Sequence, residues 1–318
     1  MDSPALDASD RPLGALVELG RLLRARDYQF VTVTPETHRR VLARRSGPAS
    51  CLRDVFGWSL PFRKTPLVDG VFELLVAAGA LLECDEGYRS AVRFSSLSSH
   101  LFAHSAYPTT DAAAVFFGPD TYRFCTMLTA RLGSGLGRVV DVGCGTGAGG
   151  IVLAASARAV VLADINDDAL RFARVNVALA GATNVEVVQS DVLGGVGGPI
   201  DLLVANPPYM ADEQGRVYRD GGGSLGEGLA VRIVAEGLQR LEAGGRLLLY
   251  TGSPIVAGSD TVRQALLPVL DRAGASFVYE ELDPDVFGEE LERTRYASAE
   301  RIAVVALDAT RRREKSGA

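Results

Sequence analysis

The spacing of apolar residues divides the chain into two regions of different character. In the first region, leucines recur at three- and four-residue intervals with arginines between them, which is typical of amphipathic helices. The pattern predicts three helices and then a two-stranded hairpin, over residues 12–27, 35–45, 68–82, 87–94 and 96–104. We therefore expect a smaller, mainly helical first domain whose element order fits a winged-helix arrangement.

The second region begins near residue 137, where short apolar runs rich in β-formers alternate with helical stretches. Seven strands are predicted, over 138–142, 159–163, 185–189, 201–205, 245–251, 276–282 and 301–307, with helices over 148–157, 167–180 and 228–242. This alternation predicts a parallel sheet with crossover helices. The strands are apolar at nearly every position, as in sheets that are covered on both faces. The last two strands are close together, which predicts a doubly wound α/β sheet with an antiparallel edge.

Length and composition fit this division. The chain has 318 residues, of which 47% are hydrophobic and 23% charged, values ordinary for a globular protein with a sizeable core. We expect an N-terminal substrate-recognition or lid domain over 1–109, a ligand-binding domain over 110–309 and a disordered tail over 310–318. No apolar run approaches the roughly 20 residues of a membrane span, and the N-terminus lacks a secretion signal. These features predict a cytoplasmic protein with no membrane partner.

Charge and cysteine usage narrow the chemistry. The formal net charge is −6, yet residues 21–64 hold ten basic and three acidic residues, a local balance of +7. Such a segment can contact phosphates or an acidic protein, and it can equally be a solvated helix face. The four cysteines include no C-x-x-C pair, so the sequence predicts neither a disulfide framework nor a zinc site, and we expect no metal.

A glycine-rich loop follows the first strand of the predicted sheet. Gly143, Gly145 and Gly147 let the backbone turn tightly and approach a ligand at the start of the next helix. The loop also contains a G-x-G-x-x-G pattern, so nicotinamide or flavin binding must be considered. Asp141, however, stands directly before the glycines, where its carboxylate would repel a pyrophosphate and attract a cationic amino acid.

The next two strands also end in acids. Asp164 is placed to accept hydrogen bonds from ribose hydroxyls, Ile165 can pack on an adenine face, and Asp191 can accept from the adenine amino group. A ligand with an ammonium group, a ribose and an adenine, but no phosphate, is S-adenosylmethionine. The predicted cofactor-binding residues are Asp141, Gly143, Cys144, Gly145, Thr146, Gly147, Asp164, Ile165, Asn166, Ser190, Asp191, Val192 and Asn206.

Four motifs, VVDVGCGTG, ADIN, SDVL and NPPY, occur in this order along the chain. Over about residues 112–309 the chain resembles the class I S-adenosylmethionine-dependent methyltransferases. The resemblance implies a Rossmann-like seven-stranded sheet whose last strand is antiparallel. It also implies methyl transfer from S-adenosyl-L-methionine, with S-adenosyl-L-homocysteine as product.

The NPPY motif, in this family, marks enzymes that methylate a nitrogen on a planar group. The side-chain oxygen of Asn206 and the carbonyl oxygen of Pro207 can each accept one N–H of the target and fix its nitrogen. Pro208 helps to freeze the corner, and Tyr209 offers a ring on which the planar group can stack. We therefore predict Asn206, Pro207, Pro208 and Tyr209 as catalytic residues.

The acceptor itself stays open. Segments 218–222 and 225–229 resemble the protein-glutamine methyltransferases that act on release factors (the methyltransferase small group), and 116–128 resembles their cofactor-covering stretch. Departures are an acidic insertion over 283–296 and a fifth strand, LLLYTG (247–252), without an acid. A glutamine-type protein acceptor is favoured. The alternatives are a nucleic-acid amino methyltransferase, a small-molecule N-methyltransferase and a non-catalytic S-adenosylmethionine-binding module. The sequence does not indicate the oligomeric state.

Overall fold

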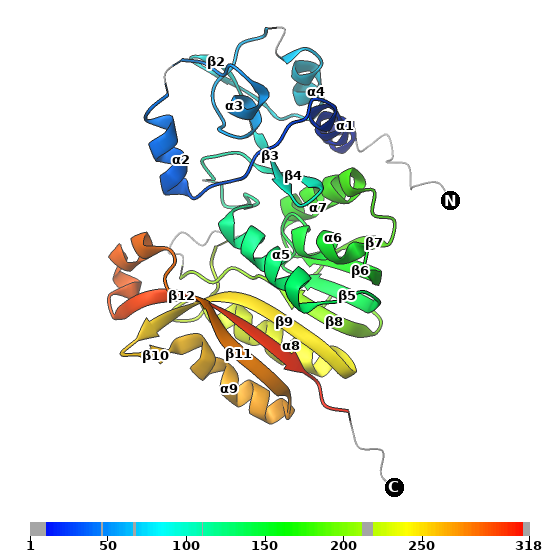
Figure 1. Ribbon diagram of the computed structural model, residues 1–318, viewed down its shortest axis with the longest axis vertical. Coiled ribbons are helices and arrows are strands. Elements are labelled where there is room, and N and C mark those ends of the chain that lie inside the picture. The colour runs from blue at the N-terminus through cyan, green and yellow to red at the C-terminus, as the bar shows by residue number, and fades with distance from the viewer. Residues whose placement is uncertain (1–10, 46, 66–67, 110, 212–218, 314–318) are drawn as a thin grey trace.

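The computed structural model describes residues 11–45, 47–65, 68–109, 111–211 and 219–313. An N-terminal region of helices and hairpins (residues 11–105) lies above a large twisted sheet that helices cover on both faces (Figure 1). The predicted α/β class is therefore confirmed. No helix among the described residues is both long and apolar enough to cross a bilayer.

Among its described residues, the N-terminal region holds four α-helices and two hairpins. The helices are α1 (Arg11–Ala25), α2 (Pro35–Leu42), α3 (Leu52–Phe56) and α4 (Val71–Ala77). Strands β1 (Leu81–Cys84) and β2 (Gly87–Ser90) form one antiparallel hairpin, and β3 (Val92–Leu97) and β4 (His100–Ser105) form another. The predicted mainly helical region is present, but the single predicted hairpin is wrong, since residues 81–105 form two.

The extra hairpin exists because the helix predicted over 68–82 ends early. Gly79 adopts φ +64° directly after the last turn, a conformation that favours glycine. The amides of Gly79 and Ala80 donate back to the carbonyls of Val76 and Leu75, which closes the helix end. The apolar residues at 80–82 therefore continue as extended chain and not as helix.

A buried asparagine joins the N-terminal region to the sheet domain. Asn176, on α7 (Asp167–Ala180), accepts a hydrogen bond from the Ala103 amide (2.7 Å) and donates to the Ala103 carbonyl (3.0 Å). Its amide also donates to the Thr146 carbonyl in the glycine loop (2.9 Å). Leu179 of the same helix packs in the core of the N-terminal region. Helix α7 therefore connects the two parts, through its buried face, next to the predicted ligand site.

The central sheet contains the seven predicted strands in the order β7–β6–β5–β8–β9–β12–β11. The strands are β5 (Leu136–Val142), β6 (Ala157–Asp164), β7 (Val185–Gln189), β8 (Ile200–Ala205), β9 (Leu241–Val256), β11 (Ser276–Asp283) and β12 (Ala299–Thr310), and the short β10 (Ser259–Asp260) pairs with β9. The first strand lies centrally and the chain winds outward in both directions, which confirms the doubly wound, Rossmann-like sheet.

The last strand is antiparallel, as predicted, but it does not form the edge. Strand β12 inserts between β9 and β11 and runs antiparallel to both. Helix α9 (Thr261–Ala273) carries the chain from β9 to the outer position, which leaves a place for β12 beside β9 (Figure 1). The sheet therefore ends in an antiparallel ladder, as expected, with the last strand of the chain in the inner position of that ladder.

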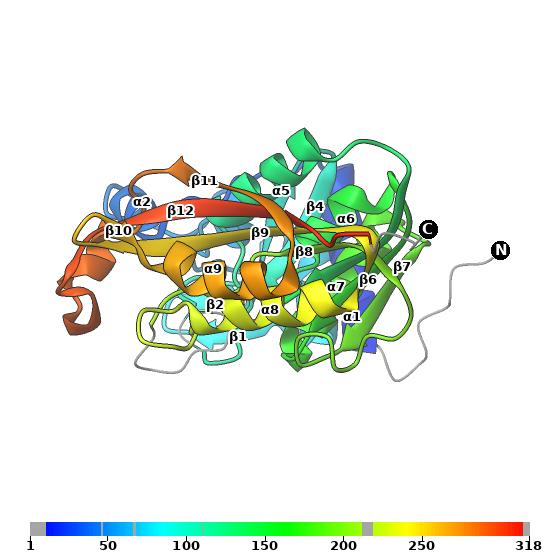
Figure 2. The same cartoon turned by 90° about the horizontal axis from the view of Figure 1, so that it is seen from below.

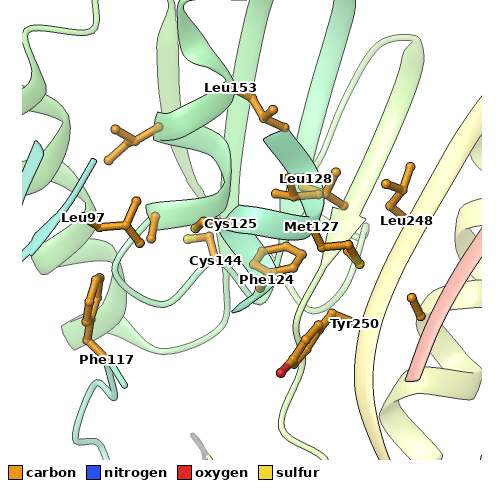
Figure 3. Packing of buried hydrophobic residues seen from close by; sticks show 14 of the residues in the cluster. Leu97, Phe117, Phe124, Cys125, Met127, Leu128, Cys144, Leu153, Leu248 and Tyr250 are labelled. Carbon is orange, nitrogen blue, oxygen red and sulfur yellow. The ribbon is translucent and has the colours of Figure 1, made fainter. Parts of the chain in front are cut away.

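Two hydrophobic clusters cover the two faces of the sheet. Along β9, Leu248 and Tyr250 enter the cluster beneath α5 (Pro119–Arg131) and α6 (Ala148–Ala154), whose packing appears in Figure 3. Leu247 and Leu249 enter the opposite cluster, beneath α8 (Gly228–Arg240) and α9. Figure 2 shows α8 and α9 on one side of the strands and α5 on the other. This alternation explains the continuous apolar runs of the sequence.

Part of the predicted C-terminal tail is ordered. Thr310 is the last residue of β12, and the Arg311 amide and carbonyl pair with the backbone of Gly245 and Gly244 of β9. The described chain therefore continues to Arg313, and residues 314–318 lie outside the described residues.

Candidate active site

The glycine loop connects the carboxyl end of β5 to α6. Gly143, Gly145 and Gly147 have φ values of +65°, +53° and +79°, the left-handed region that favours glycine. A Cβ at Gly147 would come within 2.7 Å of Leu162, whereas added Cβ atoms at Gly143 and Gly145 would meet no heavy atom within 4 Å. The loop is therefore packed at its base and open toward a cavity at its tip.

Asp141 is the carboxylate that precedes this loop. Its side chain is 2% exposed, and one oxygen accepts a hydrogen bond from the Gly150 amide at 2.8 Å. Burial raises the pKa of this carboxyl to about 7, since the Gly150 hydrogen bond only partly offsets the loss of water. A cation bound next to it would stabilise the ionised form. Asp141 is therefore suited to hold an ammonium group.

The second predicted carboxylate, Asp164, ends β6 and braces the loop. Its two oxygens accept hydrogen bonds from the amides of Gly145 (2.8 Å) and Asn166 (2.9 Å). Burial raises the pKa of Asp164, although these two hydrogen bonds act in the opposite direction. Ile165, immediately after it, is 56% exposed, which is unusual for a large apolar residue and leaves its side chain available to a flat ligand.

The third predicted segment lies at the end of β7 and is differently engaged. The Ser190 hydroxyl donates to the Val192 carbonyl (2.8 Å) and so shapes the turn. The Asp191 carboxylate accepts two hydrogen bonds from Arg232, at 2.7 and 2.9 Å, and this arginine lowers the pKa of Asp191. Asp191 therefore lines the site, but its carboxylate is already paired with Arg232 of the same chain. The sequence did not indicate this ion pair.

The NPPY corner follows β8, and its tyrosine is fixed from three sides. Tyr209 is 8% exposed and its hydroxyl donates to Asp120 at 2.5 Å. One edge of the ring meets Phe287, with centroids 6.1 Å apart. An added Cβ at Gly252 would lie 2.4 Å from the ring, so this glycine makes room for it. The Tyr209 ring is thus held rigidly, with part of its surface already covered by protein.

Asp120 is a site residue that the sequence reading did not single out. It lies on α5, is 5% exposed, and accepts hydrogen bonds from Tyr209 and from Tyr250 of β9 (2.9 Å). Arg123 lies 3.3 Å from the same carboxylate. The fifth strand of the sheet, β9, thus contributes a tyrosine that binds a carboxylate from helix α5. The segment 116–128 was the available signal, although it did not reveal this contact.

One cavity of about 510 Å³ collects these groups. It is lined by all the predicted site residues except Gly147, namely Asp141, Gly143, Cys144, Gly145, Thr146, Asp164, Ile165, Asn166, Ser190, Asp191, Val192, Asn206, Pro207, Pro208 and Tyr209. Pro35 and Thr109 close it from the N-terminal side, and Phe287 from the segment between β11 and β12. Such a volume is typical of small-molecule sites. Within the described ranges, no group of three or more His, Cys, Asp or Glu residues is arranged to hold a metal ion.

Part of the chain, including most of the segments that line the cavity, is similar to known methyltransferases. Residues 124–259 match the family model described as "Methyltransferase small domain". The release factor glutamine methyltransferase of Deinococcus radiodurans is 42% identical over 124 residues, which cover 35% of this chain and 44% of that protein. The ribosomal RNA small subunit methyltransferase C of Chromohalobacter salexigens is 35% identical over 134 residues, or 42% of this chain and 37% of that one. The chain thus spans less than half the length of either relative.

Solved structures agree on the fold. A putative transferase from Pyrococcus horikoshii superposes with a TM-score of 0.53 at 12% identity, covering 88% of this chain and all (100%) of that one. Trm5 of Methanocaldococcus jannaschii, solved in complex with adenosine, gives 0.51 at 16% identity, covering 72% and 58%. The family model and the two relatives confirm the resemblance to S-adenosylmethionine-dependent methyltransferases of the methyltransferase small group, and the solved structures support its fold.

Proposed function

We propose that this protein is an S-adenosylmethionine-dependent N-methyltransferase that acts on a planar amide or amino nitrogen. The observation that carries the proposal is the shared cavity. The glycine loop and Asp141 line one part of it, and the Asn206–Tyr209 corner lines another. A module that only binds S-adenosylmethionine would not need the second part, so we favour catalysis over the non-catalytic alternative.

The residues present fit the methyl donor. Asp141 is a buried carboxylate without a cationic partner among its described contacts, and it suits the ammonium of the methionine part. Asp164 retains acceptor capacity for ribose hydroxyls beside its two amide contacts, and the exposed Ile165 suits the adenine face. When bound, the donor supplies an activated methyl group on a sulfonium. Because Asp191 is paired with Arg232, we assign adenine recognition mainly to the Ile165 side chain and the Ser190–Val192 turn.

The corner residues would orient the acceptor. The Asn206 side-chain oxygen and the Pro207 carbonyl are both acceptors, and both belong to residues that line the cavity. Together they can take the two N–H groups of an amide or amino nitrogen and direct its lone pair. Asp120 holds Tyr209 and Tyr250 in place, so the acceptor meets a preorganised wall. The proton of the product can leave to water after transfer.

Among acceptors, we favour a protein amide of the glutamine type. Relatives named for glutamine methylation, from Deinococcus radiodurans and Escherichia coli, align over 44% and 57% of their lengths. At least five of the ten basic residues in segment 21–64 form ion pairs: Arg21 with Glu18, Arg39 and Arg40 with the shared Glu36, Arg45 with Asp54, and Lys64 with Glu73. This pairing weakens the segment as a phosphate-binding surface.

A nucleic-acid amino group is the second candidate, because relatives named for ribosomal RNA methylation also match. The two are separated by incubating the purified protein with methyl-labelled S-adenosylmethionine and a lysate divided into protein, RNA and small-molecule fractions. We expect protease-sensitive label in the protein fraction. Nuclease-sensitive label would establish the second candidate, and label confined to small molecules would contradict both. No label in any fraction would contradict methyl transfer itself.

A further inference from the structure

A second, much smaller cavity adjoins the main one. It has a volume of about 20 Å³ and shares Pro35, Thr109 and Phe116 with the 510 Å³ cavity. A space of this size accepts one water-sized group. Its wall includes Arg93 of β3 and His104 of β4, which are cross-strand partners in the second hairpin of the N-terminal region.

Arg93 is buried without a partner for its charge. The side chain is 4% exposed, and its Nε and Nη2 atoms have no hydrogen-bond acceptor among the described residues. Its guanidinium carbon lies 5.4 Å from the centroid of the Phe30 ring, a contact that attracts the cation but does not use its N–H groups. Burial lowers the pKa of Arg93 to about 10, so the group still carries its charge at neutral pH.

The surrounding groups do not neutralise this charge. None of the residues that line the small cavity is an Asp or Glu, within the part of the chain that the structure describes. The His104 Nδ1–H donates to the Ser105 carbonyl (3.0 Å), and its Nε2 lies 2.8 Å from the Ser95 hydroxyl. Burial and the nearby Arg93 keep the pKa of His104 well below its ordinary value. The cation therefore faces only neutral groups.

We propose that Arg93 binds an oxyanion, a carboxylate or phosphate oxygen, of a molecule that occupies the main cavity. An unpaired buried charge is expensive, and a bound anion would compensate it. The free Nε and Nη2 atoms form one edge of the guanidinium. Arg39 uses this same edge to bind Glu36, at 2.8 and 2.7 Å. The small cavity beside Arg93 has room for one oxygen-sized group, so one oxygen of the anion can enter it while the rest of the molecule lies in the main cavity.

The proposal rests on the proposed function, because the oxyanion has two sources in a methyl-transfer complex. One is the carboxylate of the methionine part of the donor. The other is an anionic group of the acceptor, close to the nitrogen that receives the methyl. The chemistry of recognition is the same in both cases, and a binding measurement with the donor alone tells them apart.

The first experiment uses the full chain without substrates. Thermal unfolding is followed while inorganic phosphate or acetate is added, against sodium chloride at equal ionic strength. We expect both oxyanions to raise the Tm of the wild type in a saturable way, because they bind only the folded state. Arg93→Met should abolish this rise. Arg44→Met, which removes an exposed arginine, should leave it unchanged.

Two further readouts separate ligand binding from a structural role. Without oxyanions, Arg93→Met should unfold at the same temperature as the wild type or higher, because it removes an uncompensated charge. In calorimetric titrations with S-adenosylmethionine, a tenfold or greater loss of affinity in Arg93→Met would identify the donor carboxylate. Unchanged affinity, with the oxyanion response lost, would identify the acceptor. Arg93→Gln repeats each measurement should the methionine variant fail to fold.

The proposal is overturned if replacing Arg93 changes neither the response to oxyanions nor the affinity for S-adenosylmethionine. If the proposed function is wrong, a different measurement fails. In that case the wild type would not bind S-adenosylmethionine at all, while its response to phosphate and acetate would still decide the role of Arg93.

Discussion

The two halves of the main cavity are built in different ways. The half assigned to the methyl donor comes from strand ends and the turns directly after them, and its shape depends on local geometry such as the positive φ values of Gly143 and Gly145. The acceptor half is assembled from distant segments, with Asp120 bonded to Tyr209 89 residues away and to Tyr250 130 residues away. The donor half is therefore readable in short motifs. In the acceptor half, the NPPY motif predicts the Asn206–Tyr209 corner, but its support by Asp120 is visible only in the folded chain.

The largest predicted effect concerns Asp141 in the donor half. Asp141→Asn should weaken S-adenosylmethionine binding on the order of 100-fold at pH 8, because a buried charge-assisted contact is lost. In the wild type, affinity should rise about tenfold per pH unit below the carboxyl pKa and level off above it. Isothermal titration between pH 5.5 and 8.5, spanning the Asp141 pKa of about 7, measures both effects. A pH-independent wild-type affinity would contradict this assignment.

The same carboxyl predicts a stability trend in the unliganded protein. Its folded-state pKa of about 7 lies above the ordinary 3.8, so between these values the folded protein holds a proton that the unfolded chain has released. Unliganded wild type should therefore lose stability as pH rises through this window, and Asp141→Asn should lose less. Denaturant unfolding at several pH values checks the sign. Equal slopes for the two proteins would exclude a protonated Asp141.

The next effect tests the acceptor half. Asp120→Asn should lower kcat/KM for methyl transfer by about tenfold, since the two tyrosine hydroxyls lose their shared acceptor charge. The affinity for S-adenosylmethionine should change by less than about twofold, within the context-dependence of such contacts. A large loss of donor affinity with unchanged turnover would move Asp120 from the acceptor half to the donor half.

Tyr250→Phe should give a smaller loss of about fivefold in kcat/KM, because Tyr209 keeps its bond to Asp120. The chain offers a matched control in Tyr279, which donates to Asp260 at 2.9 Å and does not line the cavity. Tyr279→Phe removes a comparable, partly buried tyrosine–aspartate bond and should reduce thermal stability without changing kcat/KM. Equal activity losses in both variants would indicate a general effect of stability.

The smallest effect is expected at Asp191. Asp191→Asn should change S-adenosylmethionine affinity by less than about threefold, because this half-exposed carboxylate is already paired with Arg232. Asp164→Asn, measured alongside, should cost more, since Asp164 is buried and braces the Gly145 amide. A larger loss at Asp191 than at Asp164 would restore the direct adenine contact that the sequence alone suggested.

The sequence predicted the sheet because its strands are apolar on both faces and its loops carry local signals. The sequence did not predict features that depend on where a helix ends or on contacts between residues far apart in the chain. Helix α9 begins after the N-cap residue Asp260 and ends at Gly274, which has φ +58°. Both residues are typical signals of helix ends, but the sequence analysis did not predict this helix. The early end of α4 at Gly79 was likewise hidden by the apolar residues that follow. The inner position of β12 depends on its pairing with both β9 and β11. A local sequence pattern does not specify which strands pair.

The candidate site divides in the same way. Every predicted carboxylate reached the cavity, since strand ends of a parallel sheet meet at one edge. The pairing of Asp191 with Arg232 spans 41 residues, and the Asp120 network spans more than twice that distance. Arg93 shows the limit most clearly, because only the folded structure reveals that a charged side chain is buried without an acid beside it.

The most direct test of the central claim compares wild type with Asn206→Ala in two measurements, binding of S-adenosylmethionine and transfer of its labelled methyl group to a lysate. We expect both proteins to bind the donor with affinities within about threefold of each other. The variant should transfer the methyl group at least about 100-fold more slowly, as expected when a preorganised polar contact to the reacting group is removed. Equal transfer by the two proteins would contradict the account.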